Sequence, residues 1–136
     1  MIRDIVHDKI FLAQKSLPAT AKDKKIAVDL ADTLRFHSDR CVGMAANMIG
    51  ESKCIIVIAV GKSILTMFNP QIIRKDKPFS TEEGCLSLTG ERPTTRYEQI
   101  EVIYQDEKMR KHKEKFTGWT AQIIQHECDH LAGILI

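Results

Sequence analysis

Between residues 22 and 36, apolar positions recur at intervals of three and four residues, and charged positions lie between them. The apolar stripe consists of Ile26, Ala27, Leu30, Ala31 and Leu34. Residues at this spacing share one face of an α-helix, and the opposite face of this segment is polar. The pattern predicts an amphipathic helix whose apolar face packs against a core.

A second pattern, in which apolar residues are continuous or alternate, begins at residue 54 and predicts β-strands. Residues 54–60 are continuously apolar and rich in β-branched side chains, which favours a central strand of a sheet. We expect a strand at residues 64–68 to end at Asn69-Pro70. Further short strands are predicted at residues 71–75, 100–104 and 115–117, with a turn at residues 81–87 and a polar hairpin turn at residues 105–114. The last helix is expected to run from Thr117 or Gly118 to Ala132, with Gly133 as its cap.

Within this last helix, His126, Glu127 and His130 form the pattern HExxH. Residues four apart lie on one face of a helix, so both imidazoles can bind one metal ion. Glu127, displaced by one residue, can reach the edge of that site and accept a proton from a metal-activated water. The pattern also arises by chance in surface helices, so a metal site requires a third ligand and a pocket.

Cys85 is the best candidate for a third ligand. Zinc-type hydrolases use three protein ligands and leave one position for water. Cys85 lies beside a glycine in a predicted turn, where its thiol can face outward. Cys128 points off the face shared by the two histidines and is interpreted as a core residue. The remaining histidines, in contexts typical of exposed surface, are His7, His37 and His112.

Length and composition narrow the class of protein. A chain of 136 residues with 43% hydrophobic and 28% charged residues is typical of one globular domain, here residues 1–136. The first eight residues carry charges where a signal peptide needs an apolar run, and no apolar run has the length of a membrane span. The four cysteines lack paired spacing, so we expect reduced thiols and a cytoplasmic enzyme.

The charge pattern gives little reason to expect nucleic-acid binding, because the net charge is only +2. Residues 105–115 contain several Lys and Arg, but Glu107 and Glu114 interrupt them. We interpret this segment as the solvated tip of a hairpin rather than as an RNA-binding patch.

Small residues are dense in residues 41–50, Cys-Val-Gly-Met-Ala-Ala-Asn-Met-Ile-Gly. Such a segment lets the backbone approach a ligand or another part of the chain closely. It has neither the spacing nor the lysine of a phosphate-binding P-loop. These residues alone favour a tightly packed turn over a ligand site.

Three segments together resemble the peptide deformylase family. Residues 83–87, Glu-Gly-Cys-Leu-Ser, match its EGCLS motif, and residues 125–131 match its QHExDHL motif. Residues 41–50 resemble its first motif, GxGLAAxQxG, in altered form. Supporting segments occur in the same order at residues 2–6, 68–73 and 96–97, so the resemblance covers nearly the whole chain.

The resemblance implies an α+β fold in which small antiparallel or mixed sheets pack around a C-terminal metal-binding helix. It implies a hydrolase that removes the formyl group from the N-terminal formylmethionine of nascent peptides, with the ribosome near its exit tunnel as a further partner. It also implies one divalent metal ion, natively Fe(II), with Zn(II) or another divalent ion as alternatives. We expect neither a membrane partner nor a specific nucleic-acid sequence.

The family's roles carry over onto matching residues. Cys85, His126 and His130 would bind the metal, and Glu127 would be the general acid and base. The metal would lower the pKa of its water, and Glu127 would take the proton and later pass it to the departing amine. The backbone N–H of Leu86 matches one of the family's donors to the oxyanion.

The last helix also suggests a pocket for the methionine side chain. Three residues precede His126 by seven, four and three positions and so share its face: Trp119, Gln122 and Ile123. Core packing explains Trp119 and Ile123 equally well. Val42 and Gly43 would contact the peptide from the opposite side, as the family's first motif does.

The chain departs from the family at Met48, where the first motif has a glutamine whose amide helps to hold the oxyanion. A thioether donates no hydrogen bond, and losing one such donor typically costs on the order of a hundredfold in turnover. Asn47 carries an amide, but adjacent residues of an extended segment point in opposite directions. Cys41 likewise replaces the first glycine of the motif.

Three hypotheses stay open at this point. The chain could be a weaker or specialised deformylase, a hydrolase that acts on another N-acyl or peptide bond, or a non-catalytic protein that binds formylated peptides or the ribosome. Glu127 favours the first, because a protein without catalysis has no evident need for a glutamate that is not a ligand.

Overall fold

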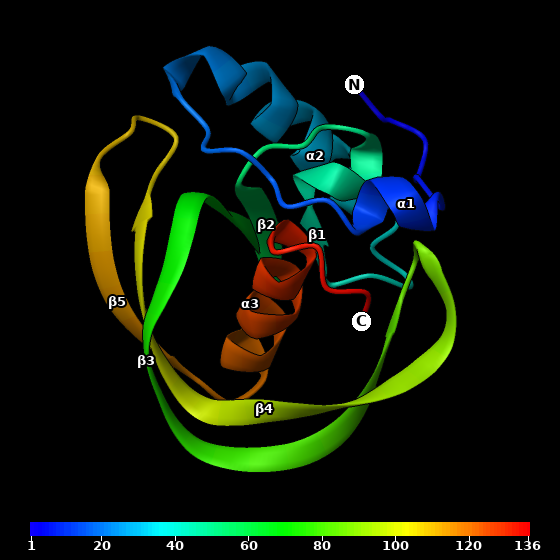
Figure 1. The fold of residues 1–136 in the computed structure, drawn as a ribbon. Helices are drawn as coiled ribbons and strands as arrows, with labels where there is room; N and C mark the ends of the chain where they lie inside the picture. The colour runs from blue at the N-terminus through cyan, green and yellow to red at the C-terminus, as the bar shows by residue number, and fades with distance from the viewer.

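The computed structural model describes all residues from Met1 to Ile136. Five strands form one antiparallel sheet in the order β1-β2-β3-β4-β5, and its long strands curve around the helix α3 (Gly118–Leu131; Figure 1). The strands are β1 (Gly43–Ala45), β2 (Ile55–Val60), β3 (Ser63–Cys85), β4 (Leu88–Gln105) and β5 (Lys111–Thr117). The other helices are α1 (Lys9–Leu12), α2 (Lys24–Phe36) and the short 3₁₀ helices η1 (Ala21–Asp23) and η2 (Ala46–Ile49). The α+β class is confirmed, with all strands in a single sheet.

The strand β2 separates two hydrophobic clusters and is buried on both faces. Ile55 and Val57 belong to the cluster that contains Leu30 of α2. Ile56 belongs to the cluster that contains Ile124 of α3. Because successive side chains of a strand point to opposite faces, β2 holds α2 on one side and α3 on the other. The predictions of a central strand and of an amphipathic helix at residues 22–36 are both confirmed.

The predicted end of a strand at Asn69-Pro70 is wrong, because residues 64–68 and 71–75 belong to the single strand β3. The register against β4 shifts at this point. Asn69 has a φ of 53°, and its side-chain amide donates to the carbonyl of Ala19 and to Oε1 of Gln105, each at 2.8 Å. A bulge held by side-chain hydrogen bonds thus accommodates the proline without ending the strand.

The hairpin of β3 and β4 is longer than the sequence pattern predicted. The predicted turn at residues 81–87 is confined to Leu86 and Ser87, and Cys85 pairs with Leu88 across it. Likewise β5 begins at Lys111 rather than at residue 115. The tip of the long hairpin reaches the N-terminal segment, where Nδ1 of His7 lies 3.0 Å from the carbonyl oxygen of Ser87.

The boundaries predicted for the last helix are confirmed. Gly133 follows the C-terminal end of α3 with a φ of 80°, and a Cβ at this position would lie 2.4 Å from the carbonyl oxygen of Ala13. Glycine is therefore required both by the backbone angle and by the close approach of the chain. This contact fixes the end of the helix that carries the HExxH pattern.

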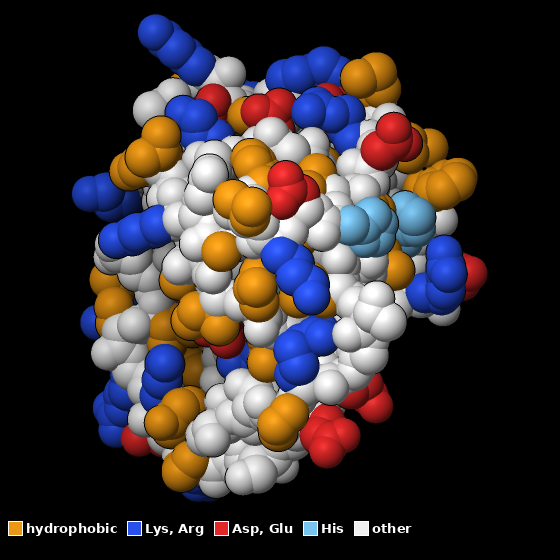
Figure 2. Space-filling model, turned by 45° about the vertical axis from the view of Figure 1, so that its right-hand side comes forward, with side chains coloured by type: hydrophobic (Ala, Val, Ile, Leu, Met, Phe, Trp, Pro, Cys, Tyr) orange, Lys and Arg blue, Asp and Glu red, His pale blue; other side chains and the backbone are white.

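The surface mixes side chains of different kinds. On the face shown in Figure 2, charged side chains of both signs are interspersed with hydrophobic ones. None of the helices combines the length and the hydropathy that a membrane crossing needs.

Candidate metal centre and active site

The buried side of α3 carries three of the candidate site residues. His126, Glu127 and His130 are 8%, 4% and 0% exposed. Gln125 fixes this part of α3 against β4, since its side chain accepts a hydrogen bond from the N–H of Tyr97 and donates one to the carbonyl of Tyr97, both at 2.8 Å. The helix therefore holds these residues at a defined depth beneath the surface.

Three potential metal-binding atoms converge where α3 meets the end of β3. Nε2 of His130 lies 3.1 Å from Nε2 of His126 and 3.3 Å from Sγ of Cys85, and all three atoms lie within 4.8 Å of one another. A tetrahedral Zn²⁺ site with ordinary bond lengths requires separations of about 3.3 Å between nitrogens and about 3.5 Å between nitrogen and sulfur. The residues predicted as ligands thus fit one divalent ion.

Sequence reasoning missed the group that orients His126. Oε1 of Glu83 lies 2.8 Å from Nδ1 of His126, which leaves Nε2 of that ring directed toward Cys85 and His130. A carboxylate in this place fixes the tautomer of a metal-binding histidine and raises its basicity. Side chains two positions apart in a strand point to the same face, so the position of Glu83 relative to Cys85 could have revealed its role.

Glu83 is itself held by four further hydrogen bonds, three from Arg96 and one from Gln122. The guanidinium of Arg96 donates to both its oxygens at 2.7 to 3.1 Å and also binds Asp129 at 2.6 Å, while Nε2 of Gln122 donates to Oε2 of Glu83 at 2.8 Å. Burial would raise the pKa of Glu83, but the hydrogen bonds from His126, Arg96 and Gln122 lower it to about 2. Glu83 is therefore a carboxylate at neutral pH.

The surroundings favour a positive charge on His126 but not on His130. Burial would lower the pKa of His126, but Cys85, Glu83 and Glu127 raise it to about 10. Burial and the neighbouring His126 lower the pKa of His130 to about 3. The surrounding groups thus stabilise one positive charge at this point, and the same field would stabilise a divalent cation.

Glu127 faces the opposite wall of the site, where β1 approaches closely. Its Oε1 is buried and has no hydrogen-bond partner, and burial raises its pKa to about 7. A Cβ on Gly43 would lie 3.0 Å from Oε2 of Glu127 and 2.6 Å from Cγ2 of Ile123. Only glycine lets β1 pass this close to α3.

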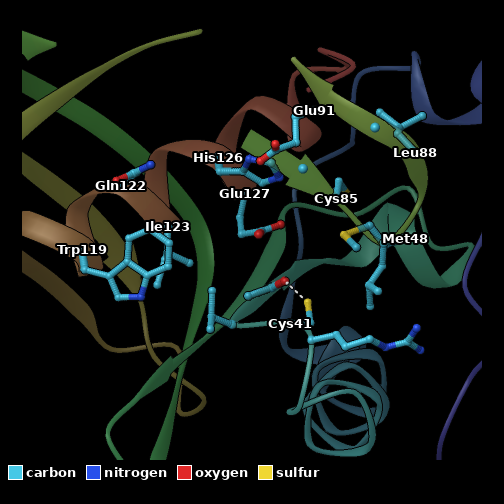
Figure 3. Close-up of a pocket in the computed structure, with 16 residues that line it drawn as sticks. Cys41, Met48, Cys85, Leu88, Glu91, Trp119, Gln122, Ile123, His126 and Glu127 are labelled. Carbon is cyan, nitrogen blue, oxygen red and sulfur yellow. Dashed lines mark hydrogen bonds between the residues drawn. The ribbon is translucent and has the colours of Figure 1, made fainter. Parts of the chain in front are cut away.

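A pocket of about 490 Å³ opens in front of these groups. His130 is fully buried and does not line it, whereas the other predicted site residues do: Val42, Gly43, Met48, Cys85, Leu86, Trp119, Gln122, Ile123, His126 and Glu127. Figure 3 shows Trp119, Gln122 and Ile123 on one side of Glu127, and Met48 and Leu88 on the other. Trp119 is 61% exposed, so it does not pack in the core, whereas Ile123 is 4% exposed and serves both core and pocket.

The wall formed by residues 41–48 presents sulfur atoms and backbone rather than a side-chain amide. The backbone N–H of Ala45 donates to Sδ of Met48 at 3.5 Å. The amide of Asn47 points away from the pocket and donates to the carbonyl of His130 at 2.9 Å, so Asn47 does not replace the missing glutamine. Cys41 donates its S–H to the carbonyl of Gly43 at 2.9 Å. Cys128 lies outside the ligand group and packs against the cluster around α3, as expected.

Comparison with known proteins gives a consistent result. The model of the family described as "Polypeptide deformylase" matches residues 2–136. A protein named peptide deformylase from Clostridium beijerinckii is 56% identical over 136 residues, which cover all of both chains.

Solved structures agree with the sequence comparison. The crystal structure of peptide deformylase from Thermotoga maritima superposes with a TM-score of 0.88 at 31% identity, covering 99% of this chain and 94% of that one. A Met-Ala-Ser-bound crystal structure of class I type b peptide deformylase from Acinetobacter baumannii superposes with a TM-score of 0.89 at 26% identity, covering 99% and 97%.

Proposed function

Because the chain belongs to the peptide deformylase family, we propose that it removes the formyl group from N-formylmethionyl peptides at the centre formed by Cys85, His126, His130 and Glu127. The observation that carries this proposal is the convergence of three potential ligand atoms beside a buried carboxylate with a free oxygen. A protein that only bound peptides would gain nothing from burying an unpartnered carboxylate, which costs folding free energy.

Cys85, His126 and His130 would hold the metal ion, and the mixed sulfur and nitrogen ligands suit Fe(II), Zn(II) or Co(II). We propose Fe(II) as the native ion. A divalent ion held there would act as a Lewis acid that lowers the pKa of water and polarises the formyl carbonyl. Glu83 and Arg96 would keep His126 in the orientation that this requires.

Glu127 would move the proton. Its carboxylate lies against the pocket wall formed by Gly43, with Oε2 on that side, and its Oε1 has no hydrogen-bond partner. It would accept a proton from the attacking water and deliver it to the amine nitrogen as the C–N bond breaks. The N–H of Leu86 would donate to the oxygen that becomes negatively charged.

The methionine side chain would occupy the end of the pocket formed by Trp119, Gln122 and Ile123, with Val42 and Gly43 against the peptide backbone. These residues lie together around one cavity. A relative from Acinetobacter baumannii has been solved with Met-Ala-Ser bound, which is a peptide that begins with methionine. The substrate of this chain would accordingly extend beyond its first residue.

We further propose that the reaction takes place in the cytoplasm, near the ribosomal exit tunnel. Formylmethionine enters proteins at the start of synthesis, so the substrate emerges there. The four cysteines of the chain are all free, which fits a reducing compartment.

The decisive test is an anaerobic assay of the Fe(II)-loaded protein on formyl-Met-Ala, with acetyl-Met-Ala as the competing N-acyl substrate. We expect deformylation by the wild type and a loss of about a thousandfold in kcat for Glu127→Gln. Metal content must remain unchanged in that variant. Cleavage of acetyl-Met-Ala in preference, or formyl-Met-Ala turnover that does not depend on Glu127, would contradict the proposal.

A further inference from the structure

A second hollow, of about 480 Å³, adjoins the active-site pocket. Arg40 and Leu86 line both hollows, so these two residues form the ridge between them. The far wall consists of residues 2–7 of the N-terminal segment and of Phe36 and His37 at the end of α2. The two hollows thus adjoin each other at Arg40 and Leu86, and together they are called the groove below.

Contacts between separate parts of the chain hold this groove in shape. The ring of His7 contacts the carbonyl of Ser87, which ties the N-terminal segment to the hairpin tip beside Leu86. The backbone N–H of Arg40 donates to the carbonyl of His37 at 2.9 Å. The rings of Phe36 and His37 pack edge to face, with centroids 5.1 Å apart. The ridge is part of the folded structure rather than a loose loop.

The groove beyond the ridge is biased toward positive charge. Arg3 is neutralised by Asp29 and Glu51, whereas Arg40 has no carboxylate within 4.0 Å. Only one carboxylate, that of Asp4, lines the second hollow. A free guanidinium at the mouth of a peptide pocket attracts carboxylates, and it can bind one with two parallel hydrogen bonds.

The path of the substrate leads toward this guanidinium. In the proposed function, the formyl group meets Cys85 and the methionine side chain enters between Trp119 and Ile123. The remaining peptide must leave the pocket elsewhere, and Cys41, the neighbour of Arg40 in the chain, lies away from Trp119 and Ile123 (Figure 3). An extended peptide advances about 3.3 Å per residue, so its third and fourth residues would lie about 7 to 10 Å beyond the methionine.

We propose that Arg40 is a specificity-determining residue that selects formyl-peptides with an acidic side chain at the third or fourth position. The inference rests on the proposed function, because it concerns the peptide that follows the formylmethionine. The guanidinium binds the substrate carboxylate at the ridge, while Leu86 contributes apolar contact on the same side. The residue acts on substrate choice and takes no part in the chemical step.

The test compares two series of formylated peptide amides, formyl-Met-Ala-Xaa-Ala and formyl-Met-Ala-Ala-Xaa, in which Xaa is Asp, Asn or Lys. Amidation removes the terminal carboxylate, which would otherwise bind Arg40 in every peptide. The quantity measured is the ratio of kcat/KM for the Asp peptide to that for the Lys peptide. We expect a ratio of about five for the wild type in one of the series, which corresponds to about 1 kcal/mol.

The variants separate a local contact from a general charge effect. Arg40→Gln should bring the ratio close to one, and Arg40→Glu should invert it. Arg35→Gln removes the same charge from the last turn of α2, outside both hollows, and should leave the ratio as in the wild type. High salt should reduce the ratio for the wild type, because mobile ions screen exposed pairs.

A ratio near one for the wild type in both series, or a ratio that Arg40→Glu leaves unchanged, would overturn this proposal. In either case the turnover of formylated peptides would leave the proposed function intact. Absence of turnover for every formylated peptide would overturn the proposed function and this inference with it.

Discussion

On one side of the pocket, α3 and the end of β3 bring together Cys85, His126 and Glu127, and Glu83 and Arg96 support them from behind. On the other side, residues 41–48 contribute two sulfur-bearing side chains and a glycine, and no side-chain amide faces the cavity. The first wall contains what a metal-dependent hydrolase needs in order to bind its ion and move a proton. The second presents Met48 where the resemblance to the family implies a glutamine amide that would hold the oxyanion.

From this difference we infer that metal binding and rate are separable properties of the site. The candidate ligands and their supporting carboxylate come from α3 and β3, with Arg96 of β4 behind them, whereas the fit around the reacting carbonyl depends on β1 and η2 as well. Substitutions in the first wall should therefore change metal content, and substitutions in the second should change turnover at constant metal content. Four variants test this division.

The largest effect is expected for Cys85→Ser. A hydroxyl is a poor ligand compared with a thiolate, so this variant should lose most of its bound metal and its activity with it. Metal analysis of the purified protein checks this, with Cys128→Ser as the matched control. Cys128 is half-buried and lies outside the ligand group, so equal metal loss in the two variants would contradict the assigned ligand set.

The second-largest effect, on metal affinity, is expected for Glu83→Gln, which removes the negative charge behind His126. Loss of such a supporting carboxylate typically weakens metal affinity by about ten- to a hundredfold. Competition with a chelator measures the change. Glu82→Gln alters the neighbouring exposed carboxylate and should keep wild-type affinity. If Glu83→Gln binds the metal as tightly as the wild type, the carboxylate of Glu83 has no influence on metal affinity.

In the second wall, Gly43→Ala should reduce kcat by about tenfold, because even a displacement of the reacting groups by less than about 1 Å slows the chemical step. The added methyl would contact Glu127 and Ile123 at 3.0 and 2.6 Å and displace them. The metal content should remain that of the wild type. A variant that loses its metal and its activity together would show that the two walls are not independent at this point.

The smallest effect, and the only gain, is expected for Met48→Gln. A side-chain amide at this position can donate to the oxyanion, so kcat should rise by roughly tenfold, less than the hundredfold that a fully aligned donor contributes. Met48→Leu removes the sulfur without adding a donor and should give no increase. A gain of similar size in both variants would place the effect in packing rather than in hydrogen bonding.

Local sequence patterns accounted for much of the site. The helical spacing of His126 and His130 and the turn beside Cys85 were visible in the sequence, and the structure brings their ligand atoms together. Both features could be predicted because each is encoded within a short stretch of neighbouring residues. The face of α3 that holds Gln122 and Ile123 was likewise predictable from a period of 3.6 residues.

Features that depend on distant pairing were not predictable. The hydrogen bonds of Glu83 with Arg96 and His126 join residues 13 and 43 positions apart. The outer parts of β3 and β4 consist mainly of polar residues, so no apolar alternation marked them as strands. Asn69 ends a run of apolar residues in the sequence, yet its side chain stabilises a bulge through Ala19, a partner 50 positions away.

The hydrogen bond from Asn47 to the carbonyl of His130 joins the two walls mechanically. Its donor belongs to η2, next to Met48, and its acceptor belongs to a residue that carries a candidate metal ligand. Ions of different radius would shift the backbone of His130 to different positions. The hydrogen bond transmits such a shift to η2, the segment that faces the reacting carbonyl. Exchange of one metal for another would then alter the shape of the substrate cavity as well as the strength of the Lewis acid.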